Sequence, residues 1–216
     1  MALTDSNAAI PVIDPAPLRP AVPYEALARL PQLHGEAGQN LVTAALLSRS
    51  PQASVLLMVL GAATLVMGAG SLKADFAWAA LVLLGIVGMT RNYIRGFARS
   101  LRRVPLAEAA SDLRALLLYT GAAWGGGAFL IMPDLPAPAL AFAFAVLPCL
   151  GIALILKDAP STLAFTAPVI LAAASAPILG AWPQDIWVAA AIILSGAAII
   201  LVRTRHSFTR GIKSIS

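Results

Sequence analysis

The sequence has 216 residues, of which 59% are hydrophobic and only 12% carry a charge. Soluble domains have about 25% charged residues, so this composition excludes an ordinary soluble domain and predicts an integral membrane protein. The net charge of +5 does not indicate nucleic-acid binding, because the basic residues cluster at the ends of apolar segments. The single cysteine, Cys149, lies in an apolar run, which excludes an intrachain disulfide and indicates a small packing residue.

The chain before the first long apolar segment divides into two parts. Residues 1–23 contain five prolines and few large apolar side chains, which predicts a flexible tail without a cleavable signal peptide. Residues 24–53 show a more periodic pattern, which predicts two short helices at the cytoplasmic membrane surface. His34 lies between these helices, and the absence of a second histidine or a cysteine nearby argues against a metal site.

Residues 54–203 are expected to form an all-α transmembrane domain of six helices. Each apolar segment is close to the roughly 20 helical residues that cross a bilayer. The connections are short, which predicts antiparallel neighbours and therefore three helical hairpins. Pro148, Pro168 and Pro177 should kink or locally unwind segments four and five, either as packing features or as hinges. The six segments are placed at 54–71, 74–91, 114–132, 138–156, 162–181 and 185–203.

The one long connection, between segments two and three, is rich in arginine. Residues 91–114 contain six arginines, and five of them would form one basic stripe on a helix at the cytoplasmic lipid surface. Because basic residues stay on the cytoplasmic side during insertion, the stripe is a topology signal, or else a site that binds anionic lipid or relays a conformational change. The residues predicted to contact lipid headgroups are Arg91, Arg95, Arg99, Arg102 and Arg103.

The charge distribution predicts that both termini are cytoplasmic. With the N-terminus inside, fourteen of the fifteen basic residues lie in the cytoplasm, and Lys73 is the exception. Each of the three external connections then carries one acid, which is Asp75, Asp134 or Asp185. The opposite orientation would place fourteen basic residues outside the cell, so the charges favour the first.

Tryptophans and a weak repeat occur at the predicted external ends of the helices. Trp78, Trp182 and Trp187 are placed where an indole can lie at the level of the lipid headgroups. The stretches DFAWAALVLLG from Asp75 and DIWVAAAIILSG from Asp185 each begin with an acid and contain a tryptophan and a late glycine. Duplication of a hairpin would explain this match, as would two helices that begin at the same interface with the same anchors.

Groups that could carry chemistry are scarce in the segments. Between residues 54 and 203 every acid and base lies near a predicted helix end, which leaves no intramembrane carboxylate for proton coupling. His34 and His206 lie outside the six segments, which argues against haem ligation. The chain has no phosphate loop, nucleophile motif, zinc spacing or dinucleotide motif. The sequence therefore predicts a non-enzymatic protein without a metal or cofactor.

Small residues and residues that break helices are most frequent in the third segment. In TGAAWGGGAFLIMP, Gly121 and Gly125 have the G-x-x-x-G spacing that lets helix backbones approach closely. Trp124 between them is either a core anchor or the wall of a ligand cavity. The candidate residues for such a cavity or for helix packing are Gly121, Trp124, Gly125, Pro168 and Pro177.

Several short features follow one another along residues 37–212. They are the stretch QNLVTAALLSRSP, the arginine-rich connection, Trp124 and Gly125 followed by Pro133, the stretch FTAPVILAAASAP and the basic exit VRTRHSFTRGIKS. Together they resemble the six-helix membrane input modules at the N-termini of many bacterial sensor histidine kinases and diguanylate cyclases. The resemblance implies a sensory module of the bacterial inner membrane, with residues 204–216 as a basic cytoplasmic exit and an output domain absent from these residues.

Two other functions compete with the sensory one. A small permease or transporter subunit would use broken helices around a midplane site, and segments four and five contain suitable breaks. Three hairpins of equal orientation and the missing midplane charge argue against it. A structural subunit of a larger complex would use the small-residue faces for docking. In each case the partners are the lipid bilayer and a second copy of the chain or another membrane or cytoplasmic signalling protein.

Overall fold

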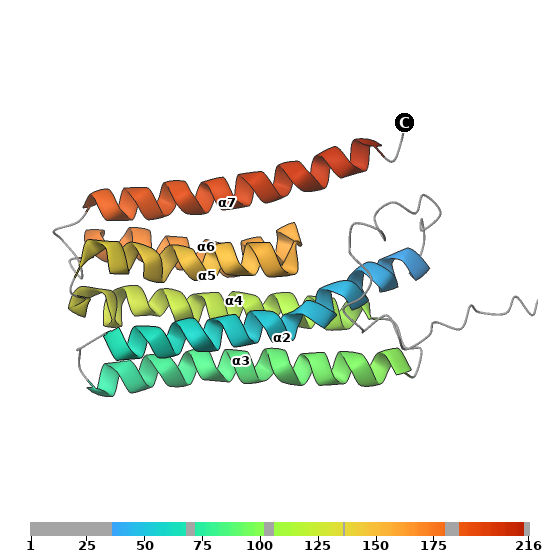
Figure 1. Cartoon of the computed structure of the whole chain (residues 1–216), viewed down its shortest axis with the longest axis horizontal. Coiled ribbons are helices and arrows are strands. Elements are labelled where there is room, and N and C mark those ends of the chain that lie inside the picture. The colour runs from blue at the N-terminus through green and yellow to red at the C-terminus, as the bar shows by residue number, and fades with distance from the viewer. Residues whose placement is uncertain (1–35, 68–71, 102–105, 136, 180–185, 214–216) are drawn as a thin grey trace, which may run out of the picture.

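The computed structural model describes residues 36–67, 72–101, 106–135, 137–179 and 186–213. Over these residues the chain is all-α, with six α-helices, one short 3-10 helix and no strand (Figure 1). The predicted tail, His34, Trp182 and Asp185 lie outside the described residues. The elements are α2 (Glu36–Met67), α3 (Leu72–Leu101), α4 (Ala107–Leu130), η2 (Met132–Asp134), α5 (Pro138–Leu156), α6 (Ala159–Ile178) and α7 (Ile186–Lys213).

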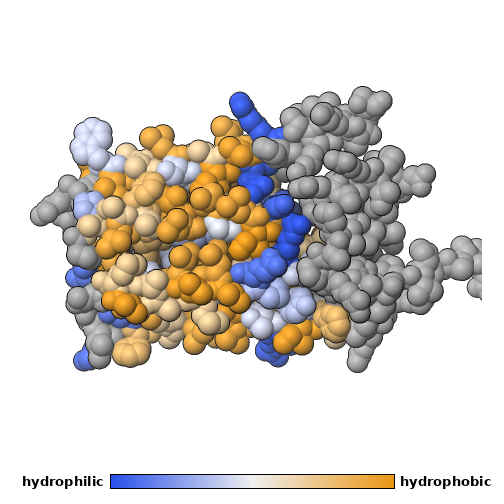
Figure 2. Space-filling view, in the orientation of Figure 1, coloured by the Kyte–Doolittle hydropathy of each residue, from blue (hydrophilic) through white to orange (hydrophobic). Residues whose placement is uncertain are grey.

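Five of these helices, α2, α3, α5, α6 and α7, are long and apolar enough to cross a membrane. Large apolar side chains on their outer faces are exposed, such as Val59 at 61% and Leu84 at 62%. Figure 2 shows apolar side chains across the middle of the bundle and a hydrophilic band beside them. Apolar surface of this extent needs an apolar surrounding. The chain is therefore a multi-pass membrane protein.

The third predicted span corresponds to α4, which is not among these five helices. Glu108, Asp112 and Arg114 lie in its first turns, and a run of three glycines follows Trp124, so it lacks a stretch as long and apolar as those of the five spans. One side of it lies against other helices, where Leu117 and Trp124 are fully buried, whereas Leu118 on another side is 52% exposed. α4 packs most extensively against α6 and α3. A helix with much of its surface against its neighbours does not require a continuous lipid-facing surface.

Four helices, α2, α3, α4 and α7, are longer than the spans that the sequence predicts. α2 continues from Glu36 through Pro51 to Met67, so the second predicted interfacial helix and the first span form one helix. Pro51 has no amide hydrogen for the Leu47 carbonyl, and the Ser50 hydroxyl donates to this carbonyl at 2.8 Å instead. α3 continues past the predicted end at residue 91 to Leu101, so part of the arginine-rich connection is helical.

The helices form a ring whose order differs from their order in the chain. The most extensive contacts join α2 to α3, α3 to α4, α4 to α6, α6 to α7, α7 to α5 and α5 back to α2. α4 and α5 make few contacts with each other, so the middle pair is not the packed hairpin that its short connection predicts. The 3-10 helix Met132–Asp134 lies between them in the chain. Further contacts, of α5 with α6 and of α2 with α4, join helices that are not neighbours in this order.

The two ends of the bundle differ in charge. The end with the α2–α3, α4–α5 and α6–α7 connections carries Asp75 and Asp134, and we call it the acidic end (Figure 1). The opposite end carries the last turns of α3 and the first turns of α4 with Arg91, Arg95 and Arg114, and we call it the arginine end. This separation of charge is the feature on which the predicted orientation depends.

The tryptophans of the sequence repeat have different environments. Trp187 on α7 is 83% exposed near the acidic end, as an interfacial anchor would be. Trp78 on α3 is only 1% exposed and packs inside the bundle. Trp78 is therefore not the lipid-facing anchor that the sequence predicts. The two helices that share the motif use its tryptophan for different purposes.

Candidate functional site

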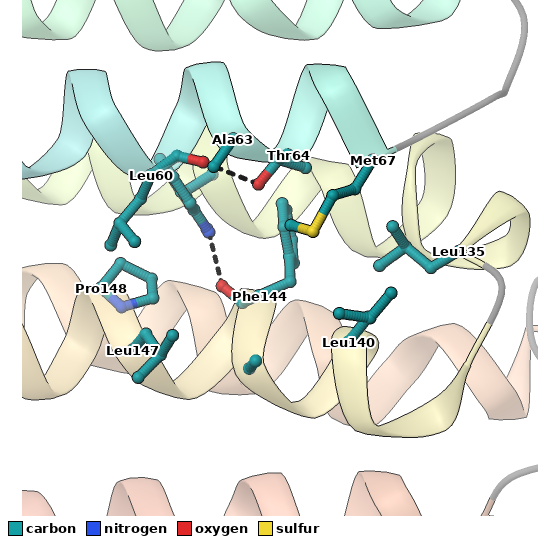
Figure 3. A pocket seen from close by; sticks show the side chains of 11 residues that line it. Leu60, Ala63, Thr64, Met67, Leu135, Leu140, Phe144, Leu147 and Pro148 are labelled. Atoms are coloured by element: carbon teal, nitrogen blue, oxygen red, sulfur yellow. Dashed lines mark hydrogen bonds between the residues drawn. The ribbon is translucent and has the colours of Figure 1, made fainter.

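A small cavity lies between α2, α4 and α5, in the half of the bundle nearer the acidic end (Figure 3). Its volume is about 50 Å³. Trp124, Phe144 and Pro148 are buried at its inner side, whereas Met67 and Leu147 are exposed at its outer side. The cavity therefore opens between α2 and α5. Its lining residues are Leu60, Ala63, Thr64, Met67, Trp124, Leu135, Leu140, Ala143, Phe144, Leu147 and Pro148.

The two polar side chains of this lining are already hydrogen-bonded. Thr64 Oγ1 donates to the Leu60 carbonyl oxygen at 2.9 Å. Trp124 Nε1 donates to the Phe144 carbonyl oxygen at 2.9 Å (Figure 3). The other lining side chains are apolar. Within the described lining, the side chains thus present an apolar surface that suits an apolar ligand.

The hydrogen bond of Trp124 depends on Pro148. In an α-helix the carbonyl of residue 144 would accept a hydrogen bond from the amide of residue 148, but proline has no amide hydrogen. A carbonyl left unpaired in an apolar environment costs several kcal/mol, and the Trp124 indole N–H satisfies this one. α5 stays helical through Pro148, so the proline creates a link to α4 and not the predicted unwinding.

Three aromatic rings from different helices form a cluster beside the cavity. The ring centroids of Trp124 and Phe144 are 5.4 Å apart, with the rings nearly parallel at 26°. Trp78 from α3 lies 5.3 Å from Trp124, edge to face, and 5.7 Å from Phe144. Such arrangements are favourable by about 0.5–1.5 kcal/mol a pair. The cluster holds α3, α4 and α5 together at the cavity floor. The indole N–H of Trp78 has no hydrogen-bond partner among the described residues.

Gly121 and Gly125 lie on the face of α4 that contacts α6. A methyl group on Gly125 would lie 2.9 Å from the Cβ of Ala172 and 2.9 Å from the carbonyl oxygen of Pro168. A methyl group on Gly121 would overlap the carbonyl oxygen of Phe165. The two glycines therefore let the backbones of α4 and α6 touch, as small residues do between membrane helices.

The predicted site residues thus divide into two groups. Trp124 lines the cavity, while Gly121, Gly125 and Pro168 belong to the contact between α4 and α6. The side chain of Pro177 lies outside the described residues. One face of α4 therefore supports the cavity and another supports helix packing.

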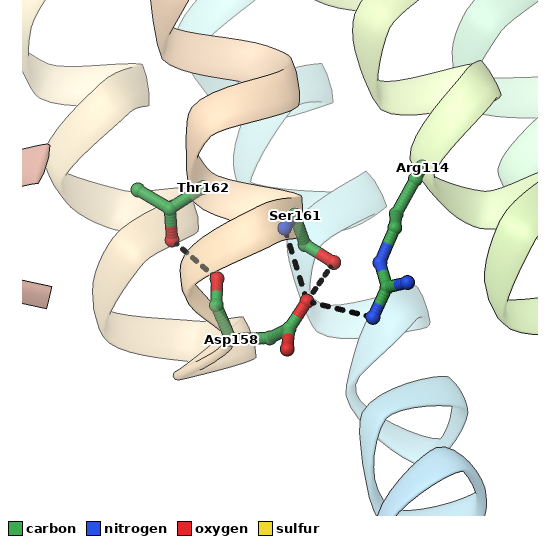
Figure 4. A network of polar contacts seen from close by, with 4 residues as sticks. All are labelled: Arg114, Asp158, Ser161 and Thr162. Atoms are coloured by element: carbon green, nitrogen blue, oxygen red, sulfur yellow. Dashed lines mark hydrogen bonds and ion pairs between the residues drawn. The ribbon is translucent and has the colours of Figure 1, made fainter. Parts of the chain in front are cut away.

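A second polar link joins α4 to the turn between α5 and α6 at the arginine end (Figure 4). Lys157 ends α5 in the left-handed conformation with φ of 55°. Asp158 then starts α6, because its carboxylate accepts hydrogen bonds from the amide of Ser161 at 3.0 Å and from its hydroxyl at 2.5 Å. Arg114 Nη2 lies 3.5 Å from the same carboxylate oxygen. The chain therefore ties α4 to the end of α5 through Asp158.

The arginines of the predicted basic stripe also lie in different environments. Arg91 and Arg95 are exposed on α3, with the exposed apolar Ile94 beside them. Side chains of this kind extend along an apolar surface and place the charge at the headgroups. Arg99 instead pairs with Glu108 of α4 at 3.3 Å. Arg102 and Arg103 lie outside the described residues.

The sequence interpretation missed most of the cavity lining, including Thr64 and Phe144. One local signal was available, because a proline inside an apolar helix always frees the carbonyl four residues earlier, here that of Phe144. Nothing local could identify Trp124 as the donor. In the described part of the chain, no three His, Cys, Asp or Glu residues are placed to hold a metal ion. Comparison with protein-family models, with curated proteins and with solved structures found no match to this chain.

Proposed function

We propose that the chain is a non-enzymatic sensory module of the bacterial inner membrane, which passes a conformational change to a cytoplasmic output domain or partner. The observation that supports this most is the length of α7. The helix is continuous from Ile186 to Lys213, whereas its apolar span ends at Arg205. The backbone hydrogen bonds of an α-helix fix the rotation of each residue relative to the next. A rotation or shift of the span would therefore reach the residues beyond it.

The contacts of α5 connect this helix to the cavity. α5 forms one wall of the cavity and also packs against α7. It is joined to α4 by the bond between Trp124 and the Phe144 carbonyl, and at its end by the ion pair between Arg114 and Asp158. The backbones of α4 and α5 come close at few points in the described helices, and the stacked rings of Trp124 and Phe144 bridge the space between them. An occupant of the cavity that displaced α5 would therefore also displace α7, on which α5 packs.

The proposed orientation has six spans with the arginine end and both termini in the cytoplasm. In a Cys149→Ala background, K73C and D134C should react with a membrane-impermeant maleimide in intact cells, because Lys73 and Asp134 are exposed at the acidic end. S100C, at the arginine end, should react only after the membrane is permeabilised. Labelling of S100C in intact cells, with D134C protected, would show that the chain has the opposite orientation.

The sensory function is tested by a fusion of residues 1–212 to a diguanylate cyclase output domain that keeps its own signalling helix. Insertion of one to four alanines after Arg203 should change cyclase activity with helical periodicity, because each added residue rotates the rest of the helix by about 100°. Insertion of about seven alanines, or two helical turns, serves as the control and should restore the original activity. A flat or steadily declining response would show that α7 does not transmit and would favour a docking or transport role.

A further inference from the structure

The outer side of the cavity opens toward the bilayer. Its opening lies between α2 and α5, which both have the length and composition of membrane spans. Met67 is 44% exposed and Leu147 is 48% exposed at this opening. Exposed residues in a membrane span face lipid chains, since the hydrocarbon layer contains no water to cover them. A molecule would therefore enter the cavity sideways from the membrane.

Water is a poor occupant of this cavity. A buried water molecule needs two to four polar partners. The Thr64 hydroxyl and the Trp124 indole N–H, the two polar side-chain groups of the lining, already donate to the Leu60 and Phe144 carbonyl oxygens. The remaining described lining is apolar, and an apolar cavity stays dry or takes an apolar guest.

The size of the cavity limits the guest. Pockets for whole drug-sized ligands enclose about 300–1,000 Å³, and an apolar cavity that binds benzene encloses about 150 Å³. This cavity of about 50 Å³ has room for only a short stretch of hydrocarbon. A long molecule must keep most of its length outside, and the neighbouring bilayer supplies such molecules.

We propose that the cavity between α2, α4 and α5 holds the end of an acyl chain of a membrane lipid. Moving a methylene group from the bilayer into the cavity gains little hydrophobic free energy, because both surroundings are apolar. The gain comes from van der Waals contacts with walls that an empty cavity leaves without partners. Occupancy of the cavity therefore depends on the shape and order of the acyl chain, and it changes when the order of the hydrocarbon layer changes.

This inference names the ligand class of the proposed sensory function and rests on that function only for the consequence of binding. Binding itself is measured separately. A positive binding result together with a flat response to alanine insertion would keep the lipid site and reject the sensory role. A negative binding result together with a periodic response to alanine insertion would keep the sensory role and reject this site.

The test uses quenching of Trp124 fluorescence by brominated lipid. A full-length variant with W78F, W182F and W187F retains Trp124 as its single tryptophan, at the floor of the cavity. It is reconstituted in phosphatidylcholine vesicles whose acyl chains carry bromine either near the headgroup or near the terminal methyl group. Bromine near the terminal methyl group should quench Trp124 more strongly, because the end of the chain enters the cavity.

Adding A143L should remove this excess quenching, since Ala143 lines the cavity and leucine would fill it. A190L is the matched control, because Ala190 is exposed on α7 and away from the lining; it should leave the quenching unchanged. Equal quenching in the A143L and A190L proteins would overturn the proposal. Quenching by a brominated free fatty acid in unlabelled vesicles, without quenching by the brominated phospholipid, would also overturn the assignment to a bilayer lipid.

Discussion

Replacing Gly121 with alanine is expected to destabilise the protein by about 1–3 kcal/mol, the usual cost of adding a methyl group to a packed interface. The new methyl group would overlap the backbone carbonyl oxygen of Phe165 on α6. A backbone atom cannot rotate away as a side chain can, so α4 and α6 must separate. Because this is among the most extensive helix contacts of the bundle, the melting temperature in detergent should fall by several degrees.

Gly126 provides the matched control for this substitution. A methyl group there would meet nothing within 4 Å. Alanine also favours the helical conformation by about 1 kcal/mol over glycine, so G126A should be neutral or stabilising. A double substitution of Gly121 and Gly125 with leucine should disrupt the α4–α6 contact more severely than G121A. Equal melting temperatures for G121A and G126A would show that this face of α4 does not pack against α6.

Replacing Trp124 with phenylalanine is expected to cost about 1–2 kcal/mol in a background that retains Pro148, because the Phe144 carbonyl then loses its hydrogen-bond donor. In a P148A background the same substitution should cost less. Alanine restores an amide hydrogen at position 148, and this amide can donate to the Phe144 carbonyl within α5. The two substitutions should therefore be non-additive in a double-mutant cycle measured by unfolding in mixed detergent micelles.

Trp78 offers a control for the same cycle. Its ring belongs to the same aromatic cluster, but its indole N–H donates to no partner among the described residues. W78F should therefore cost the same with and without P148A. If W124F and W78F gave equal coupling to P148A, the cycle would report ring packing, and the hydrogen bond would not link α4 to α5.

The sequence predicts the local features of this fold well, because they depend on residues that are close in the chain. The apolar segments predict the helices, and the arginines mark one end of the bundle. The helix starts also follow local chemistry, since Asp158 precedes α6 and caps it through Ser161. The continuous helix through Pro51 was harder to predict, because it relies on the Ser50 hydroxyl to satisfy the Leu47 carbonyl.

The order of helices in the ring could not be predicted in the same way. A short connection favours neighbouring helices, yet α4 and α5 contact each other little, since α4 packs on α6 through Gly121 and Gly125. That preference arises from the complementary surface of α6, which lies far along the chain. The cavity results from the same arrangement, so its lining comes from three helices and the connection before α5, which no local pattern links. For the same reason hydropathy could not distinguish buried Trp78 from exposed Trp187.

The ring order also has a consequence for how the protein assembles during synthesis. α2, α3 and α4 can pack as they leave the ribosome, since α3 contacts α2 and α4 contacts α3. α5 contacts both α2 and α7, so its place is completed only when the last helix has been made. The junction of α2 with α5 joins distant parts of the chain and should be among the last to form. The cavity opens at this junction, so its two outer walls come together only when the ring closes.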